Sequence, residues 1–135
     1  MPQDSPVISP TRTFQPHTWW HVLLYSSLEV ALADVRKEIA FCRKVGVPII
    51  GVIENMSGFV CPGCKTESQI FPATTGGAAL MSEKLDCPFL GRVSLDPRVG
   101  QCCDEGKPFI ETYPDTIVAK QYLDIVEQLK AFCAQ

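Results

Sequence analysis

The residues best suited to chemistry in this 135-residue chain are Cys61 and Cys64, which enclose Pro62 and Gly63. Two intervening residues let both thiolates bind one metal, and thiolates favour zinc or iron–sulfur clusters. The same spacing occurs in redox-active dithiols, whose first cysteine begins a helix. Residues 65–69 lack the long apolar helix that such a dithiol needs. The spacing therefore indicates metal binding, with a dithiol and two incidental exposed thiols as the other interpretations.

The remaining cysteines do not complete a metal site in one chain. A structural zinc site usually takes two such pairs about 12 to 20 residues apart, and no second pair of this spacing exists. Cys102 and Cys103 are adjacent, so their side chains should diverge. With half a tetrahedral site per chain, two chains could share one zinc ion or one [4Fe–4S] cluster across a two-fold axis. We expect buried structural thiols at Cys42, Cys87 and Cys133, which lie in apolar patterns.

Composition excludes several classes of protein. The net charge of -3 and the pI near 5.3 argue against nucleic-acid binding through a basic face. The longest apolar stretch, Trp19 to Leu24, is too short to span a bilayer, which takes roughly 20 residues. Seven cysteines without a signal peptide indicate a reducing cytosolic or nuclear setting. We therefore expect neither nucleic acid nor membrane as a partner.

Two elements precede the cysteine pair and must position it. A helix is predicted from a capping box, with Ser26 as N-cap and Glu29 three residues later, to a C-terminal stop at Gly46. The apolar, β-branched run 47–53 predicts a strand buried on both faces of a parallel sheet. Residues 54–58 are then expected to form a polar loop at the carboxyl edge of that strand, where open α/β sheets bind ligands.

Helix and strand alternate through the rest of the chain, which predicts an α/β fold. A strand at residues 19–25 would bring the number of strands to three, a thin sheet for a strand that is buried on both faces. We therefore expect the second half of a larger, doubly wound domain. The further predicted elements are a helix at 76–85, a strand at 89–93, a loop at 94–97, a helix at 99–106 and a helix from about 115 to 132.

A phosphate-binding loop is absent from the sequence. Its signature, G-x-x-x-x-G-K-[ST], is approached only between Gly100 and Lys107. There Asp104 and Glu105 would repel a phosphate, and Pro108 has no hydroxyl for magnesium. No catalytic serine, paired carboxylate or metalloprotease pattern occurs either, so we predict no catalytic centre in this chain.

Several segments together resemble one known family. They are residues 34–39, residues 51–59, the Cys61–Cys64 pair, residues 71–77 and residues 90–97. In this combination they resemble the Mrp/NBP family of P-loop ATPases, which includes cytosolic iron–sulfur cluster assembly factors. The string ENMSGF-x-C-x-x-C is the most specific part, and the resemblance runs from about residue 28 to residue 133.

The resemblance implies a fold, a cargo and partners. The fold would be the C-terminal portion of a doubly wound P-loop NTPase sheet of the SIMIBI type, incomplete here. Cys61 and Cys64 of two subunits, in a homodimer or with a paralogous subunit, would hold a bridging, labile [4Fe–4S] cluster. That cluster would be delivered to cytosolic and nuclear apoproteins. ATP with magnesium belongs to the full-length family context, in which Asn55, Asp96 and Pro97 would line the base pocket.

The chain also departs from the family. The family's P-loop, switch regions and N-terminal four-cysteine site are missing, so no ATP hydrolysis is expected from this chain alone. Residues 1–27 are expected to be a disordered leader unrelated to the family, and 28–135 the C-terminal part of its ATPase domain. The chain has the character of a truncated product. Two alternatives remain: a dimer bridged by structural zinc, and a non-functional fragment.

Overall fold

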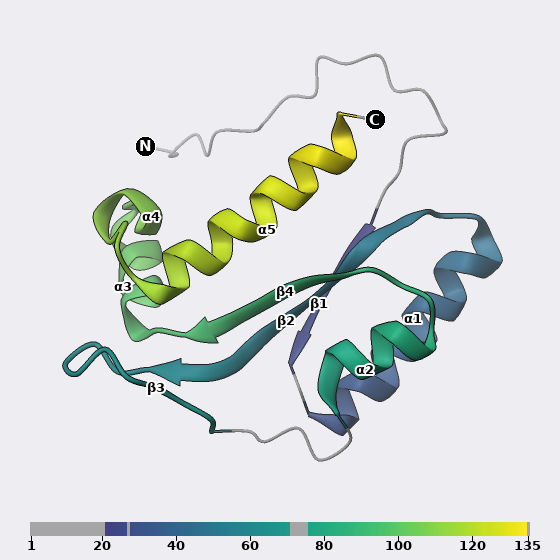
Figure 1. Cartoon of the computed structure of the whole chain (residues 1–135), viewed down its shortest axis with the longest axis horizontal. Coiled ribbons are helices and arrows are strands. Elements are labelled where there is room, and N and C mark those ends of the chain that lie inside the picture. The colour runs from purple at the N-terminus through teal and green to yellow at the C-terminus, as the bar shows by residue number, and fades with distance from the viewer. Residues whose placement is uncertain (1–20, 27, 71–75, 135) are drawn as a thin grey trace, which may run out of the picture.

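The computed structural model describes residues 21–26, 28–70 and 76–134, which form a mixed sheet with helices on both faces (Figure 1). The predicted α/β fold is confirmed. The strands are β1 (His21–Ser26), β2 (Ile49–Val60), β3 (Glu67–Ser68) and β4 (Phe89–Leu95), and the helices are α1 (Glu29–Val45), α2 (Gly77–Lys84), α3 (Pro97–Glu105), α4 (Phe109–Thr112) and α5 (Ile117–Cys133).

Strand β2 is the centre of the sheet, as its apolar sequence predicts. It runs parallel to β1 on one side and to β4 on the other, while β3 adds antiparallel pairs at its far end. Val52 pairs with Leu23 of β1 and with Phe89 of β4, and it is fully buried. Val52 lies in the core beneath α1 and α2, and the next residue, Ile53, packs against the second core on the opposite face, so the predicted strand covered on both faces is confirmed here.

The predicted polar loop at residues 54–58 is wrong, because β2 continues through it to Val60. Two polar side chains at these positions, those of Glu54 and Ser57, are buried within the strand. The strand is nonetheless distorted here. Met56 has φ of 56°, and the register against β4 shifts between Asn55 and Phe59. Strand β2 therefore continues through these polar residues with an irregular backbone, while β1 and β4 remain paired with it at Glu54 and Asn55.

Helices α1 and α2 cover one face of the sheet (Figure 1). Gly46 ends α1 in the left-handed conformation with φ of 74°, as predicted. The predicted N-cap is wrong: Ser26 ends β1, where it pairs with Asn55, and Leu28 occupies the cap without a side-chain hydrogen bond. The buried residues of this first core are Leu23, Tyr25, Leu32, Val35, Ile39, Val52, Ala78, Met81 and Cys87.

Helix α5 packs on the opposite face, over β4 and the distal part of β2 (Figure 1). Its approach is close at Gly91, where a Cβ atom would lie 3.2 Å from Ile125 Cγ1 and where φ is +142°. Glycine is therefore the residue that fits this backbone and this spacing. The short helices α3 and α4 stand at the β3 end of the sheet. The buried residues of this second core are Val60, Val93, Val118 and Ile125.

The expected leader overlaps the described structure only at its end. Strand β1 begins at His21, so the strand predicted near residues 19–25 is present, while residues 1–20 lie outside the described chain. None of the helices at residues 21–26, 28–70 and 76–134 has both the length and the apolar character to cross a membrane.

Candidate metal-binding site

The cysteine pair lies at the tip of a hairpin between β2 and β3. The Cys61 N–H donates to the Thr66 carbonyl at 3.1 Å, and the Lys65 N–H donates to the Cys61 carbonyl at 2.8 Å. Lys65 takes the left-handed conformation, with φ of 58°, to close the turn. Residues 61–66 thus fold back tightly, and both cysteines lie on the same turn at the end of the sheet (Figure 1).

Both thiols are free, and they differ in exposure and acidity. Cys61 is half-buried and Cys64 is exposed. A hydrogen bond from the Thr66 side chain, followed by the Thr66 backbone N–H and the Cys61 side chain, lowers the pKa of Cys64 from 9.0 to about 7. The thiolate is the form that binds metal. The turn therefore holds a thiol whose lowered pKa favours the thiolate form.

This acidity predicts selective alkylation of Cys64. In the metal-free chain, the rate of Cys64 modification by iodoacetamide should rise with a midpoint near pH 7, because only the thiolate reacts. Thr66→Val should move that midpoint to higher pH, because it removes the first hydrogen bond. Mass spectrometry of each cysteine-containing peptide measures the rates, with exposed Cys103 as the internal comparison. Equal midpoints at Cys64 in the parent chain and the Thr66→Val variant would contradict this assignment.

The described part of one chain brings only two candidate metal ligands together, Cys61 and Cys64. Within residues 21–26, 28–70 and 76–134, no group of three or more His, Cys, Asp or Glu side chains could hold a metal ion. Cys42 and Cys87 are buried as predicted, and Cys102 is buried while its neighbour Cys103 is exposed. Cys133 is exposed at the end of α5, so the prediction of a buried thiol there is wrong. Two thiols per chain match half of a four-thiolate centre.

The residues predicted to contact a nucleotide base lie in β2 and directly after its neighbour β4. Asn55 is in the distorted part of β2, opposite Val93 of β4, and its Oδ1 accepts from the Met56 N–H at 3.0 Å. Asp96 and Pro97 follow β4 directly and begin α3. Their strands pair, which places both predicted contacts toward the same end of the sheet. Their role toward a nucleotide stays a prediction.

Asp96 already has a structural role. Its buried carboxylate caps α3 by accepting from the Arg98 N–H at 3.0 Å, and it forms an ion pair with the Arg98 guanidinium at 2.6 Å. Burial alone would raise the pKa of Asp96, but the Arg98 hydrogen bonds and charge outweigh it and hold the pKa below its ordinary value. The carboxylate therefore stays ionised and fixes the first turn of α3.

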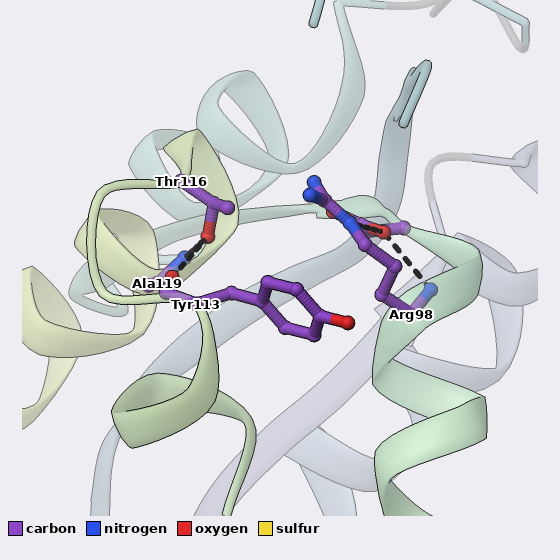
Figure 2. Close-up of polar contacts among 5 residues, drawn as sticks. Arg98, Tyr113, Thr116 and Ala119 are labelled. Carbon is purple, nitrogen blue, oxygen red and sulfur yellow. Dashed lines mark hydrogen bonds and ion pairs between the residues drawn. The ribbon is translucent and has the colours of Figure 1, made fainter. Parts of the chain in front are cut away.

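A pocket of about 310 Å³ lies between the cysteine hairpin and the start of α5. One wall is formed by the Arg98 guanidinium, 4.9 Å above the centre of the Tyr113 ring, and Thr116 caps α5 nearby (Figure 2). Sequence reasoning missed this pocket. The sequence offered only the N-cap spacing of Thr116 ahead of Ala119, which marks the start of α5, another wall of the pocket. The lining residues are Val60, Lys65, Arg98 and residues 112–117, without Asn55, Asp96 or Pro97.

Comparison with known families gives a match over most of the chain. The sequence model of the family described as ParA, NUBPL iron-transfer P-loop NTPase, matches residues 14–130. The matched range contains β1 and part of the segment that we expected to be a leader. It also contains the cysteine hairpin and the turn at Asp96.

Solved structures show the same fold in longer chains. The cell division ATPase MinD of Pyrococcus furiosus aligns over 84% of this chain with a TM-score of 0.63 at 19% identity. MinD of Pyrococcus horikoshii, complexed with Mg-ADP, aligns over 85% with a TM-score of 0.63 at 21% identity. A nucleotide-binding protein of Archaeoglobus fulgidus in complex with ADP aligns over 66% with a TM-score of 0.55 at 23% identity. The chain spans 43%, 42% and 36% of these three chains, respectively.

Proposed function

We propose, from the premise that this chain belongs to the ParA family of NUBPL-type iron-transfer P-loop NTPases, that it carries an iron–sulfur cluster as cargo. Cys61 and Cys64 would bind it, together with the same pair of a second copy or of a paralogous subunit. The observation that carries the proposal is the hairpin itself: two free thiols on one turn, one of them exposed and acidified, with no third ligand among the described residues.

The chemistry of the donor set supports a shared [4Fe–4S] cluster. Such a cluster takes four cysteine thiolates, and each hairpin supplies two. Soft thiolates select iron–sulfur clusters or zinc over hard cations. The hairpin projects beyond the strands that hold it (Figure 1), so a second hairpin can approach without disturbing either core. The cluster would then lie between the chains.

An exposed ligand also suits transfer. Cys64 is open to solvent, and a recipient protein's thiolate could displace it from the cluster without unfolding of the hairpin. We therefore propose delivery to iron–sulfur apoproteins of the cytosol and nucleus. The string ENMSGF-x-C-x-x-C supports placing the chain with the cytosolic assembly factors of its family.

Nucleotide would act only when the rest of a P-loop domain is present. Two of the similar structures hold ADP, whereas this sequence has no phosphate-binding loop. We propose that Asn55 and the Asp96–Pro97 turn would contact the base in such a complete domain. Phosphate binding and hydrolysis would depend on residues outside this sequence.

Metal and sulfide analysis tests the proposed cargo. After anaerobic reconstitution with ferrous iron and sulfide, we expect iron and sulfide in equal amounts, at about two of each per chain, as one shared cubane requires. A structural zinc bridge predicts instead about one zinc ion per two chains and no bound sulfide. Zinc retained in place of iron and sulfide under these conditions would contradict the cargo and favour the zinc-bridged dimer.

A further inference from the structure

A hydrogen-bond network joins the cysteine hairpin to the rest of the fold. Ser94, near the end of β4, exchanges two hydrogen bonds with Gln121 of α5: its N–H donates to Gln121 Oε1 at 3.0 Å, and its Oγ accepts from Gln121 Nε2 at 3.1 Å. The Ser94 hydroxyl then donates to the Glu67 carboxylate of β3. The network thus runs from α5 through β4 to the strand that follows the cysteine pair.

The direction of these bonds selects a hydrogen-bond acceptor at position 67. Gln121 uses its carbonyl oxygen on a backbone N–H and its amide on the Ser94 oxygen, so the hydroxyl proton of Ser94 is left for a third group. Ser94 is buried, and an unpaired hydroxyl there would be costly. Glu67 is the acceptor, and an ionised carboxylate makes the stronger, charge-assisted bond.

The sheet alone holds the hairpin weakly. Strand β3 has two residues, paired with Phe59 and Val60 of β2. Gly58 lets the Glu67 side chain approach, because a Cβ at position 58 would lie 3.1 Å from Glu67 Oε1 and 3.2 Å from the Ser68 carbonyl oxygen. The missing side chain at position 58 leaves room for the carboxylate on the surface of β2.

We propose that Glu67, through Ser94 and Gln121, is a positioning residue that holds the Cys61–Cys64 turn ready for its cargo. The inference rests on the proposed function. Glu67 stands three residues after Cys64, and the Ser94 bond adds to the two pairs of β3 and to the Cys61–Thr66 backbone bond in fixing this arm of the hairpin. Residues that hold metal ligands in position commonly raise metal affinity. They do so because the ligands are then already ordered before the metal binds.

Zinc affinity of the full chain tests the proposal, with Zn²⁺ alone as the probe. We expect Glu67→Ala and Ser94→Ala to weaken Zn²⁺ binding by about 10- to 100-fold, measured by competition with a chromophoric chelator, as for supporting residues of other sites. Glu67→Gln should recover much of the affinity, since its amide oxygen can still accept from Ser94. The matched control is Gln69→Ala, on the same exposed arm of the hairpin.

These measurements distinguish a positioning role of Glu67 from a loss of stability in the variant and from failure of the proposed iron–sulfur cargo. The thermal midpoint of the metal-free Glu67→Ala chain should fall modestly, because the buried Ser94 hydroxyl loses its acceptor. Zn²⁺ affinities are therefore compared at a temperature at which circular dichroism shows both metal-free chains folded. Unchanged Zn²⁺ affinity in Glu67→Ala, equal losses in Glu67→Ala and Gln69→Ala, or no Zn²⁺ binding by the parent chain would overturn the positioning role. A parent chain that binds Zn²⁺ but takes up no iron and sulfide would instead contradict the proposed function, while the positioning role would stand.

Discussion

Serine at Cys61 or Cys64 is expected to abolish retention of an iron–sulfur cluster. Each substitution removes one thiolate from each chain, so a cluster shared by two chains would lose two of its four ligands. A serine hydroxyl is a poor replacement because it is not ionised at neutral pH. Iron and sulfide after reconstitution and gel filtration should therefore fall to background in Cys61→Ser, in Cys64→Ser and in the double variant.

The chain offers a matched control in Cys103, which is exposed on α3. Cys103→Ser should retain the parent's iron and sulfide, because its thiol lies outside the hairpin. Circular dichroism of the metal-free variants should remain that of the parent, since Cys64 is exposed and contributes little packing. Full cluster content in the double variant, or equal loss in Cys103→Ser, would contradict the assignment of the cluster to Cys61 and Cys64.

Leu32→Ala is expected to lower the free energy of unfolding by about 2–5 kcal/mol. Leu32 is fully buried in the first core, between α1 and the sheet, so its truncation leaves a cavity. A domain of this size typically has about 5–15 kcal/mol of stability, so the loss would be a large fraction of the total. Urea unfolding followed by circular dichroism measures the change as a shift in the midpoint.

Val30→Ala on the same helix is the control, because Val30 is 80% exposed. Its effect should stay within about 0.5 kcal/mol, as for most surface positions. The same experiment tests the alternative of a non-functional fragment. A parent chain without a cooperative urea transition, or equal effects of the two substitutions, would contradict the core described for α1 and β2.

Elements with a clear hydrophobic period were predictable from sequence. The apolar run after Gly46 predicted the buried central strand, and the helix predicted from about residue 115 to 132 is α5, which contributes Val118 and Ile125 to the second core. The continuation of β2 through residues 54–58 was not predictable from local sequence. Its polar residues favour a loop, and pairing with β1 and β4 at Glu54 and Asn55, and with β3 and β4 at Phe59, keeps them in the strand.

The candidate site could be proposed from sequence where its chemistry depends on spacing alone. Cys61 and Cys64 could be singled out because two intervening residues place both thiols on one turn. The network that we propose to support them could not be predicted, because Glu67, Ser94 and Gln121 are distant from one another in sequence and meet only in the folded chain. The ion pair of Asp96 with Arg98 was also missed, although Asp-Pro before a helix is a capping signal.

The measurement that tests the central claim most directly is native mass spectrometry of the anaerobically reconstituted chain. The account predicts a species of two chains with about four irons and four sulfides, which falls to single chains when Cys61 and Cys64 are both serine. A cluster that stays on single chains, or dimers that form without iron and sulfide and persist in the double variant, would contradict a cargo shared between two hairpins.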